Sequence, residues 1–133
     1  MRNMPRKQLV LVGGGHAHVF VLEAFARRPM PGLDITLLTK EPMAPYSGML
    51  PGFVAGHYRL DECLIDLKRL CKAAGVHLIE GAAIGIDREK RRVSLANGSP
   101  LSYDVLSVDV GITPDVDEIA GAEAHALLVQ PAS

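Results

Sequence analysis

Tryptophan is absent from this chain, and aromatic residues together make up only 5% of it. This scarcity argues against a surface on which nucleic-acid bases stack. The formal net charge is -1, so no excess of positive charge favours a polyanionic partner. We therefore expect no nucleic-acid partner.

The chain also has no long hydrophobic run. The apolar stretch that follows its basic start, Leu9–Val12, is shorter than the ~7–15 residues of a secretory signal core. No stretch approaches the ~20 apolar residues of a spanning helix. We therefore expect no transmembrane segment and a cytoplasmic location.

Cysteine is scarce as well, with only Cys63 and Cys71. Their spacing fits neither a Cys-x-x-Cys redox pair nor a zinc site, and a cytoplasmic chain keeps its thiols reduced. We expect two packed thiols. The length of 133 residues and the hydrophobic content of 48% suit one folded domain with a real core.

What the sequence does have is a glycine turn between an expected strand and an expected helix. The apolar run Leu9–Val12 leads into Gly13, Gly14 and Gly15, and apolar residues recur at helical spacing from Val19 onward. The first glycine permits a tight turn, and the third leaves room for a pyrophosphate close to the backbone. Amides at a helix start attract an anion. The pattern therefore predicts a dinucleotide site.

One position departs from the Gly-x-Gly-x-x-Gly fingerprint, because its last glycine is replaced by His18. That glycine lets helix and strand pack closely, so His18 is expected either to push them apart or to point away. A tight turn without a ligand is the alternative interpretation. His16 and His18 diverge on a helix, so we expect no metal site between them.

The rest of the chain predicts an α/β fold with a parallel sheet, flanking helices and a small antiparallel β-meander. Asp66 is predicted to be the N-cap of the second helix, and Gly75 is predicted to be the C′ residue that follows its end. Asp109 is unusual within an apolar strand, where it is expected to face solvent or to bond locally. The expected elements are a helix from His16 to about Arg28, strands at Asp34–Thr39 and Val76–Ile79, a helix within Asp61–Ala74, the meander from Ala82, and a strand at Leu101–Val110.

Dinucleotide folds place an acid at the end of the second strand, where it holds the adenosine ribose. This chain has Thr39 there, followed by Lys40 and Glu41. A threonine hydroxyl can still bond a ribose hydroxyl, though more weakly than a carboxylate. The following segment, 41–57, contains too many prolines and glycines for a long helix, yet it is apolar. We expect it to lie against the core, a partner or a flat ligand.

This order of motifs resembles the N-terminal FAD-binding region of the pyridine nucleotide-disulfide oxidoreductase superfamily, in particular type II NADH dehydrogenases and sulfide:quinone oxidoreductases. More narrowly, the segments Gly13–His18 and Pro45–Gly52 resemble the flavoprotein domain fused to some selenophosphate synthetases. The resemblance covers nearly all of residues 8–114 and implies a Rossmann-like FAD/NAD(P)-binding fold.

The resemblance implies a set of cofactor-binding residues and no catalytic side chain. By it, Gly13, Gly15, His16 and Ala17 hold the FAD pyrophosphate, Thr39 and Lys40 lie at the ribose, Ser47 and Gly48 lie along the inner part of the cofactor, Ala83 meets the adenine, and Gly111 closes over the cofactor. Asp109 and Val110 stand where the family usually has Ala-Thr.

The resemblance also implies a division of the chain into a flexible arm (1–7), a partial FAD-binding domain (8–114) and a linker (115–133) toward an NAD(P)H domain that the chain lacks. The implied function is the FAD-binding portion of an NAD(P)H-dependent flavin oxidoreductase. The alternative is a non-catalytic nucleotide-binding module that keeps only the ADP half-site and uses Tyr46–Val54 as a partner surface. Self-association through exposed apolar surface is also expected.

Overall fold

The computed structural model describes residues 5–112, 115–116 and 118–126. These residues form two compact units. The first comprises the residues up to Ala44 together with Asp66–Val110, and the second comprises Pro45–Ile65 together with the residues from Gly111 onward.

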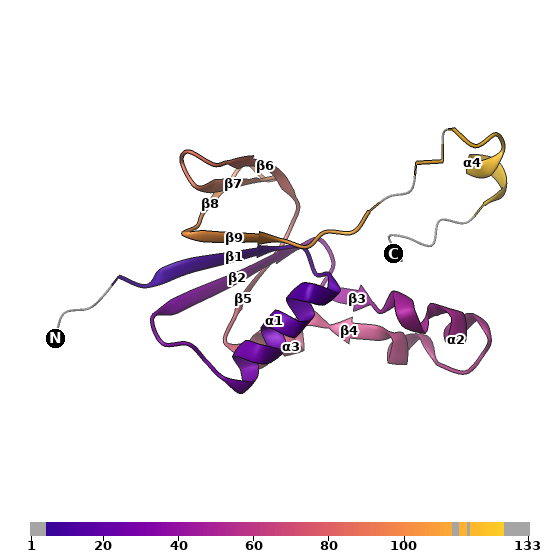
Figure 1. Cartoon of the computed structure of the whole chain (residues 1–133), viewed down its shortest axis with the longest axis horizontal. Coiled ribbons are helices and arrows are strands. Elements are labelled where there is room, and N and C mark those ends of the chain that lie inside the picture. Colours follow the sequence, from indigo (N-terminus) through magenta and orange to yellow (C-terminus); the bar gives the residue numbers. More distant parts are fainter. Residues whose placement is uncertain (1–4, 113–114, 117, 127–133) are drawn as a thin grey trace. The chain divides into compact units, whose positions relative to one another are not determined.

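A parallel sheet of four strands forms the centre of the first unit, in the order β5-β2-β1-β9 (Figure 1). Its strands are β1 (Lys7–Val12), β2 (Leu33–Thr39), β5 (His77–Glu80) and β9 (Val105–Val108). Two crossover helices connect the strands, α1 (His16–Arg27) and α3 (Leu67–Ala74). The predicted βαβ unit and the parallel sheet are confirmed.

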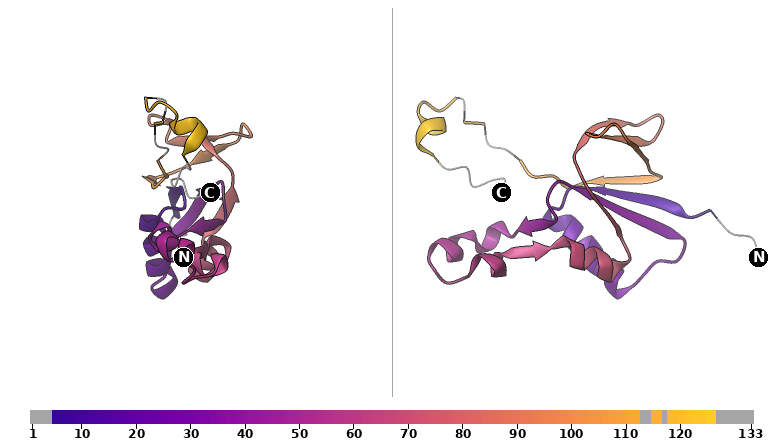
Figure 2. Two further views of the ribbon diagram at one scale, coloured as in Figure 1. Left: turned by 90° about the vertical axis from the view of Figure 1, so that its right-hand side faces the viewer. Right: turned by 180° about the vertical axis from the view of Figure 1, so that it is seen from behind.

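The unit has three layers, with α1 and α3 on one face of the sheet and a small antiparallel sheet on the other (Figure 2). The antiparallel sheet contains β6 (Ala83–Asp87), β7 (Arg92–Leu95) and β8 (Pro100–Ser102). Val10 and Val12 of β1 pack against Val93 and Leu95 of β7. Because side chains alternate along a strand, the buried Leu11 faces the helices. The predicted α/β class with a meander is confirmed.

The prediction of one strand over Leu101–Val110 is wrong. The chain bends at Tyr103–Asp104, so that β8 completes the antiparallel sheet and β9 joins the parallel sheet beside β1. The carboxylate of Asp104 accepts a hydrogen bond from the backbone amide of Gln8 (2.7 Å), and this bond fixes the bend against β1.

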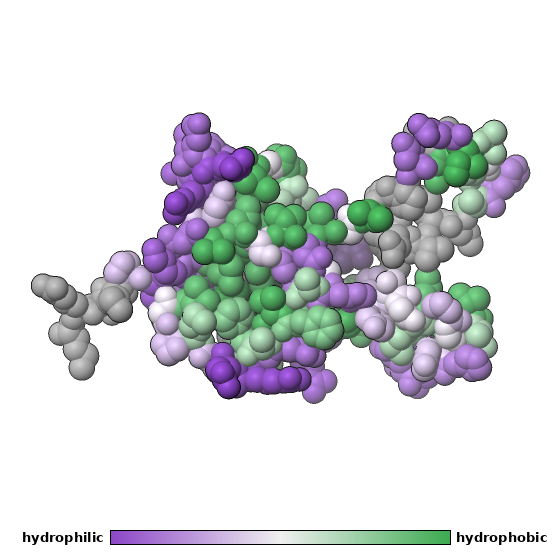
Figure 3. Space-filling view, in the orientation of Figure 1, coloured by the Kyte–Doolittle hydropathy of each residue, from purple (hydrophilic) through white to green (hydrophobic). Residues whose placement is uncertain are grey.

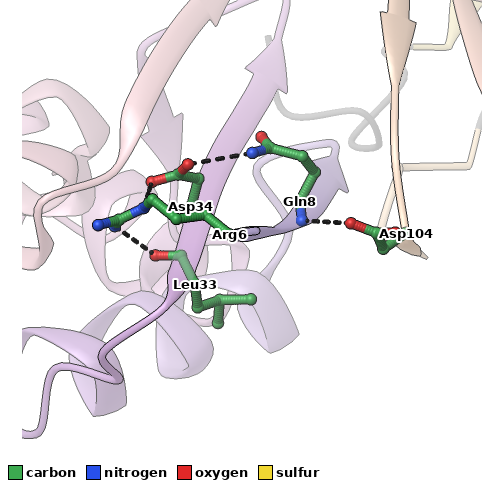
Figure 4. A network of polar contacts seen from close by, with 5 residues as sticks. All are labelled: Arg6, Gln8, Leu33, Asp34 and Asp104. Carbon is green, nitrogen blue, oxygen red and sulfur yellow. Dashed lines mark hydrogen bonds and ion pairs between the residues drawn. The ribbon is translucent and has the colours of Figure 1, made fainter. Parts of the chain in front are cut away.

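A polar network holds the amino-terminal ends of β1 and β2 together (Figure 4). Asp34 of β2 accepts hydrogen bonds from Arg6 Nε (2.6 Å) and from Gln8 Nε2 (3.0 Å). The network fixes the register of these strands at the edge of the sheet that lies opposite the glycine turn. Within the predicted arm 1–7, Lys7 begins β1 and Arg6 is paired with Asp34, and residues 1–4 lie outside the described part.

Both predicted ends of the second helix are confirmed, but the helix is short. The Asp66 carboxylate accepts a hydrogen bond from the Arg69 amide (3.0 Å), and Gly75 follows the helix with φ of 67°. Lys68 Nζ lies 2.8 Å from Glu80 Oε1, and this hydrogen bond and charge raise the pKa of Lys68. Residues 61–66, included in the prediction, instead form part of a 3-10 turn and a strand.

The second unit contains only short elements, as the many prolines and glycines of the predicted loop indicate. They are η1 (Ser47–Met49), α2 (Leu50–Val54), η2 (Leu60–Cys63), β4 (Leu64–Asp66) and α4 (Ala122–His125). β4 pairs with β3 (Met43–Pro45).

Among the described residues, no helix has the length and hydrophobicity to cross a bilayer. Residues 127–133 of the predicted linker lie outside the described part.

Both cysteines are buried free thiols, as the sequence predicts. Burial raises the pKa of the Cys71 thiol from its ordinary value of 9.0 to about 11. The folded state therefore holds this proton more tightly than the unfolded chain does. Its contribution to stability is complete below pH 9.0 and is lost as the pH rises through about 11.

We expect native protein at pH 8 to react slowly with Ellman's reagent, because thiol reactivity requires an accessible thiolate. After unfolding in guanidinium, both thiols should react at once. A Cys63→Ser variant isolates the reaction of Cys71. Rapid stoichiometric labelling of native Cys63→Ser protein would contradict the burial of Cys71.

Candidate functional site

The order of the parallel strands creates a topological switch point at the carboxyl ends of β1 and β9. From β1 the chain proceeds through α1 to β2 on one side, whereas β9 joins β1 on the other side. Ligands of open α/β sheets bind at this kind of position. The glycine turn Gly13–Gly15 follows β1, and Asp109 and Val110 follow β9.

Backbone hydrogen bonds fix the glycine turn to both neighbouring strands. The Gly13 amide donates to the Leu38 carbonyl of β2 (2.8 Å), and the Gly15 amide donates to the Asp109 carbonyl (3.2 Å). The Asp109 amide in turn donates to the Val12 carbonyl (2.8 Å). The turn is therefore an ordered part of the sheet edge.

Packing within the protein itself requires a glycine at position 13, where an added Cβ atom would meet backbone. Gly13 has φ of +97°, and a Cβ atom there would overlap the Asp109 carbonyl. A Cβ atom on Gly15 would overlap the Asp109 carboxylate, and one on Gly14 would lie 2.6 Å from Leu67 Cδ1. The glycine at position 13 is thus explained without a ligand, whereas the close contacts at Gly14 and Gly15 are with side-chain atoms.

His18 is buried, with 1% of its surface exposed, and both ring nitrogens are bonded. Nδ1 lies 2.7 Å from the Gly13 carbonyl oxygen, and Nε2 lies 2.8 Å from Ser107 Oγ. Because a carbonyl only accepts, Nδ1 is the donor toward Gly13, and Nε2 lies within hydrogen-bond distance of the Ser107 hydroxyl. Of the two expectations for His18, the one in which it points away is wrong, because the buried imidazole joins the turn and the helix start to β9. The other, that it pushes helix and strand apart, stays a prediction.

Asp109, which directly follows β9, also binds the start of α1, although the two are far apart in sequence. Its Oδ2 accepts a hydrogen bond from the backbone amide of His18 (3.0 Å). The first turn of α1 has no acidic residue of its own, so Asp109 supplies the negative charge that the positive end of the helix dipole attracts. The lone carboxylate after an apolar strand was the only sequence signal of this role.

Two amides at the turn and the helix start are open. In the part of the chain that the structure describes, the Gly14 and Ala17 amides make no hydrogen bond. Gly14 is half-buried and Ala17 is exposed, and both residues lie at the positive end of the helix. Free amides at a helix start suit a phosphate oxygen. The residues present therefore fit a pyrophosphate, with the Asp109 charge beside it.

Thr39 is buried at the carboxyl end of β2, next to the turn. A Cβ atom on Gly14 would lie 3.3 Å from Thr39 Oγ1. That hydroxyl donates to the Glu41 carbonyl (3.1 Å), so toward a ribose it has acceptor capacity left and no donor. Lys40 and Glu41 are exposed.

Known proteins resemble this chain in sequence. No family model matches it. The assimilatory nitrate reductase electron transfer subunit of Bacillus subtilis is 29% identical over 122 residues, which cover 90% of this chain and 16% of that protein. The sulfide-quinone reductase of Aquifex aeolicus is 26% identical over 105 residues, covering 79% of this chain and 24% of that protein.

Solved structures show the same fold. The sulfide:quinone oxidoreductase of Aquifex aeolicus superposes with a TM-score of 0.75 at 27% identity, covering 89% of this chain and 27% of that one. The NAD-dependent persulfide reductase of A. fulgidus superposes with a TM-score of 0.75 at 26% identity, covering 89% of this chain and 24% of that one. The proteins that this chain resembles in sequence and fold belong to the pyridine nucleotide-disulfide oxidoreductase superfamily. The predicted family resemblance is confirmed, and the narrower likeness to the selenophosphate-synthetase flavoprotein domain stays a prediction.

The alignments cover most of this chain but only a small part of each curated relative. The chain spans 16% and 24% of the two curated relatives above, although they cover most of the chain. The activities of those whole proteins are therefore not assigned to this chain by the likeness.

The remaining predicted site residues are divided between the two units. Ala83 begins β6 in the first unit, half-buried and paired with Leu95. Ser47, Gly48 and Gly111 belong to the second unit, where a Cβ atom on Gly48 would lie 3.1 Å from the Tyr46 ring. Among the described residues, no group of three or more His, Cys, Asp or Glu side chains is placed to hold a metal ion.

Proposed function

We propose that the chain is the FAD-binding portion of an NAD(P)H-dependent flavin oxidoreductase. The observation that carries the proposal is the pair of open amides, Gly14 and Ala17, at a helix start on a topological switch point. The superfamily relationship supports it, and the name of the NAD-dependent persulfide reductase supports a pyridine nucleotide as the reductant.

The chain's own residues would bind and orient the cofactor. In the proposal, Gly13, Gly15, His16 and Ala17 line the pyrophosphate, Thr39 accepts from the ribose and Lys40 lies beside it, Ala83 meets the adenine, Ser47 and Gly48 lie along the inner part, and Gly111 closes the site. Bound FAD would supply hydride and electron transfer, which amino-acid side chains do not provide. No side chain of this chain is proposed as acid, base or nucleophile.

The proposal extends to the parts of the protein beyond this site. We expect residues 115–133 to lead toward an NAD(P)H domain in a cytoplasmic protein. Several hydrophobic side chains are exposed in the first unit, among them Ile84, Val105 and Val108 at 69%, 57% and 52%. Ile84 lies on β6, and Val105 and Val108 lie on β9. Figure 3 shows hydrophobic surface in the region of these two strands. Self-association through such surface is part of the proposal.

The test is a calorimetric titration of the 133-residue chain with FAD and, in parallel, with ADP-ribose. Saturable binding of both supports the proposal, and tighter binding of FAD means that the flavin ring is held as well. Equal and weak binding of both favours the alternative, a module that keeps only the ADP half-site. Binding of neither ligand by a folded chain would overturn the proposal.

A further inference from the structure

We propose that Asp109 is an internal anion that competes electrostatically with the pyrophosphate of the nucleotide and so sets the affinity of the site. The inference rests on the proposed function, because it concerns the same helix start. In this inference Asp109 weakens nucleotide binding, whereas the other residues of the proposed site favour it.

The position of the Asp109 carboxylate supports this role. Its Oδ2 accepts from the His18 amide at 3.0 Å, one residue beyond the open amide of Ala17. It also lies where a Cβ atom on Gly15 would be. The carboxylate thus lies against the positive end of α1, the region that a phosphate group would use.

No side chain in the described part of the chain forms an ion pair with this carboxylate. Asp109 is half-buried, so water screens its charge less than it screens a fully exposed carboxylate. A pyrophosphate that binds at the Gly14 and Ala17 amides therefore meets a fixed negative charge.

The same charge stabilises the protein when no nucleotide is bound. A carboxylate at a helix start is favourable, and here it also joins α1 to the end of β9. Asp109 should therefore increase the stability of the free chain while it decreases the affinity for anionic ligands. A residue with only a structural role would not change the affinity in this direction.

Asp109→Asn tests the proposal because it removes the charge and keeps an oxygen that accepts from the His18 amide. We expect the variant to bind ADP-ribose and FAD about tenfold more tightly, since one repulsive charge is removed from the site. Its affinity for uncharged adenosine should not change. Its Tm should fall by about 2–5 °C, because the favourable charge at the helix start is lost.

Asp104→Asn is the matched control. It removes an equal charge from the residue that precedes β9, where Asp104 accepts from the Gln8 amide at the opposite edge of the sheet. We expect reduced stability and unchanged affinity for ADP-ribose. This control separates a local effect of Asp109 from the change in net charge.

The outcomes separate this inference from the proposed function. Tighter binding by Asp109→Asn alone supports both. Unchanged or weaker binding by Asp109→Asn, or an equal gain in the Asp104→Asn control, overturns the competition while the nucleotide site stands. If neither the wild-type chain nor Asp109→Asn binds any nucleotide and both are folded, the proposed function fails and this inference fails with it.

Discussion

Replacing Gly13 with alanine is expected to lower the free energy of unfolding by about 3–4 kcal/mol. The φ of +97° is unfavourable for any residue with a Cβ, and that Cβ would overlap the carbonyl oxygen of Asp109. Because the Asp109 carbonyl is backbone and directly follows β9, the overlap is relieved only if the end of β9 separates from the turn. Urea denaturation followed by circular dichroism measures the change.

Gly32→Ala is the matched control for this prediction. Gly32 also has a positive φ, +79°, but no atom lies within 4 Å of the position of its missing Cβ. The control should therefore lose only about 1 kcal/mol, from backbone strain alone. Equal losses in the two variants would show that the close approach of Asp109 does not limit residue 13.

Replacing His18 with alanine is expected to lower the free energy of unfolding by about 3–4 kcal/mol. The substitution leaves a cavity beside the sheet and removes both bonds of the imidazole, so the Gly13 carbonyl and the Ser107 hydroxyl lose their partner. Chemical denaturation of the variant measures the loss.

A His18→Gly variant sharpens this test, because glycine is the residue of the dinucleotide fingerprint at that position. We expect a loss at least as large as for alanine, since this chain has packed its turn around the ring. Phe20→Ala, at an exposed position of the same helix (69%), should change stability by less than about 0.5 kcal/mol. A more stable His18→Gly variant would contradict the joining role of the imidazole.

The parts of the fold predicted correctly are those that local sequence determines. The apolar run Leu9–Val12 and the stop signals after Arg28 specify a strand and a helix from neighbouring residues alone. Asp66 and Gly75 likewise show the ends of α3 through their own capping chemistry. The division of Leu101–Val110 into two strands depends on pairing with β7 and β1, which no local pattern encodes.

The arrangement of the site was less predictable for the same physical reason. His18 and Asp109 are 91 positions apart in sequence, yet they share a hydrogen bond at the helix start. The sequence predicts that Gly15 leaves room for a ligand, whereas in the structure the Asp109 carboxylate already lies against that position. A glycine turn by itself is therefore weaker evidence for a nucleotide than the open amides beside it.

The central claim is that the helix start at the switch point binds the pyrophosphate, and amide chemical shifts test it most directly. We would titrate ¹⁵N-labelled protein with ADP-ribose and follow each backbone amide. The account predicts the largest shifts at Gly14 and Ala17, with smaller shifts at Thr39. Saturable binding with the largest shifts at the opposite edge of the sheet, around Gln8 and Asp104, would contradict it.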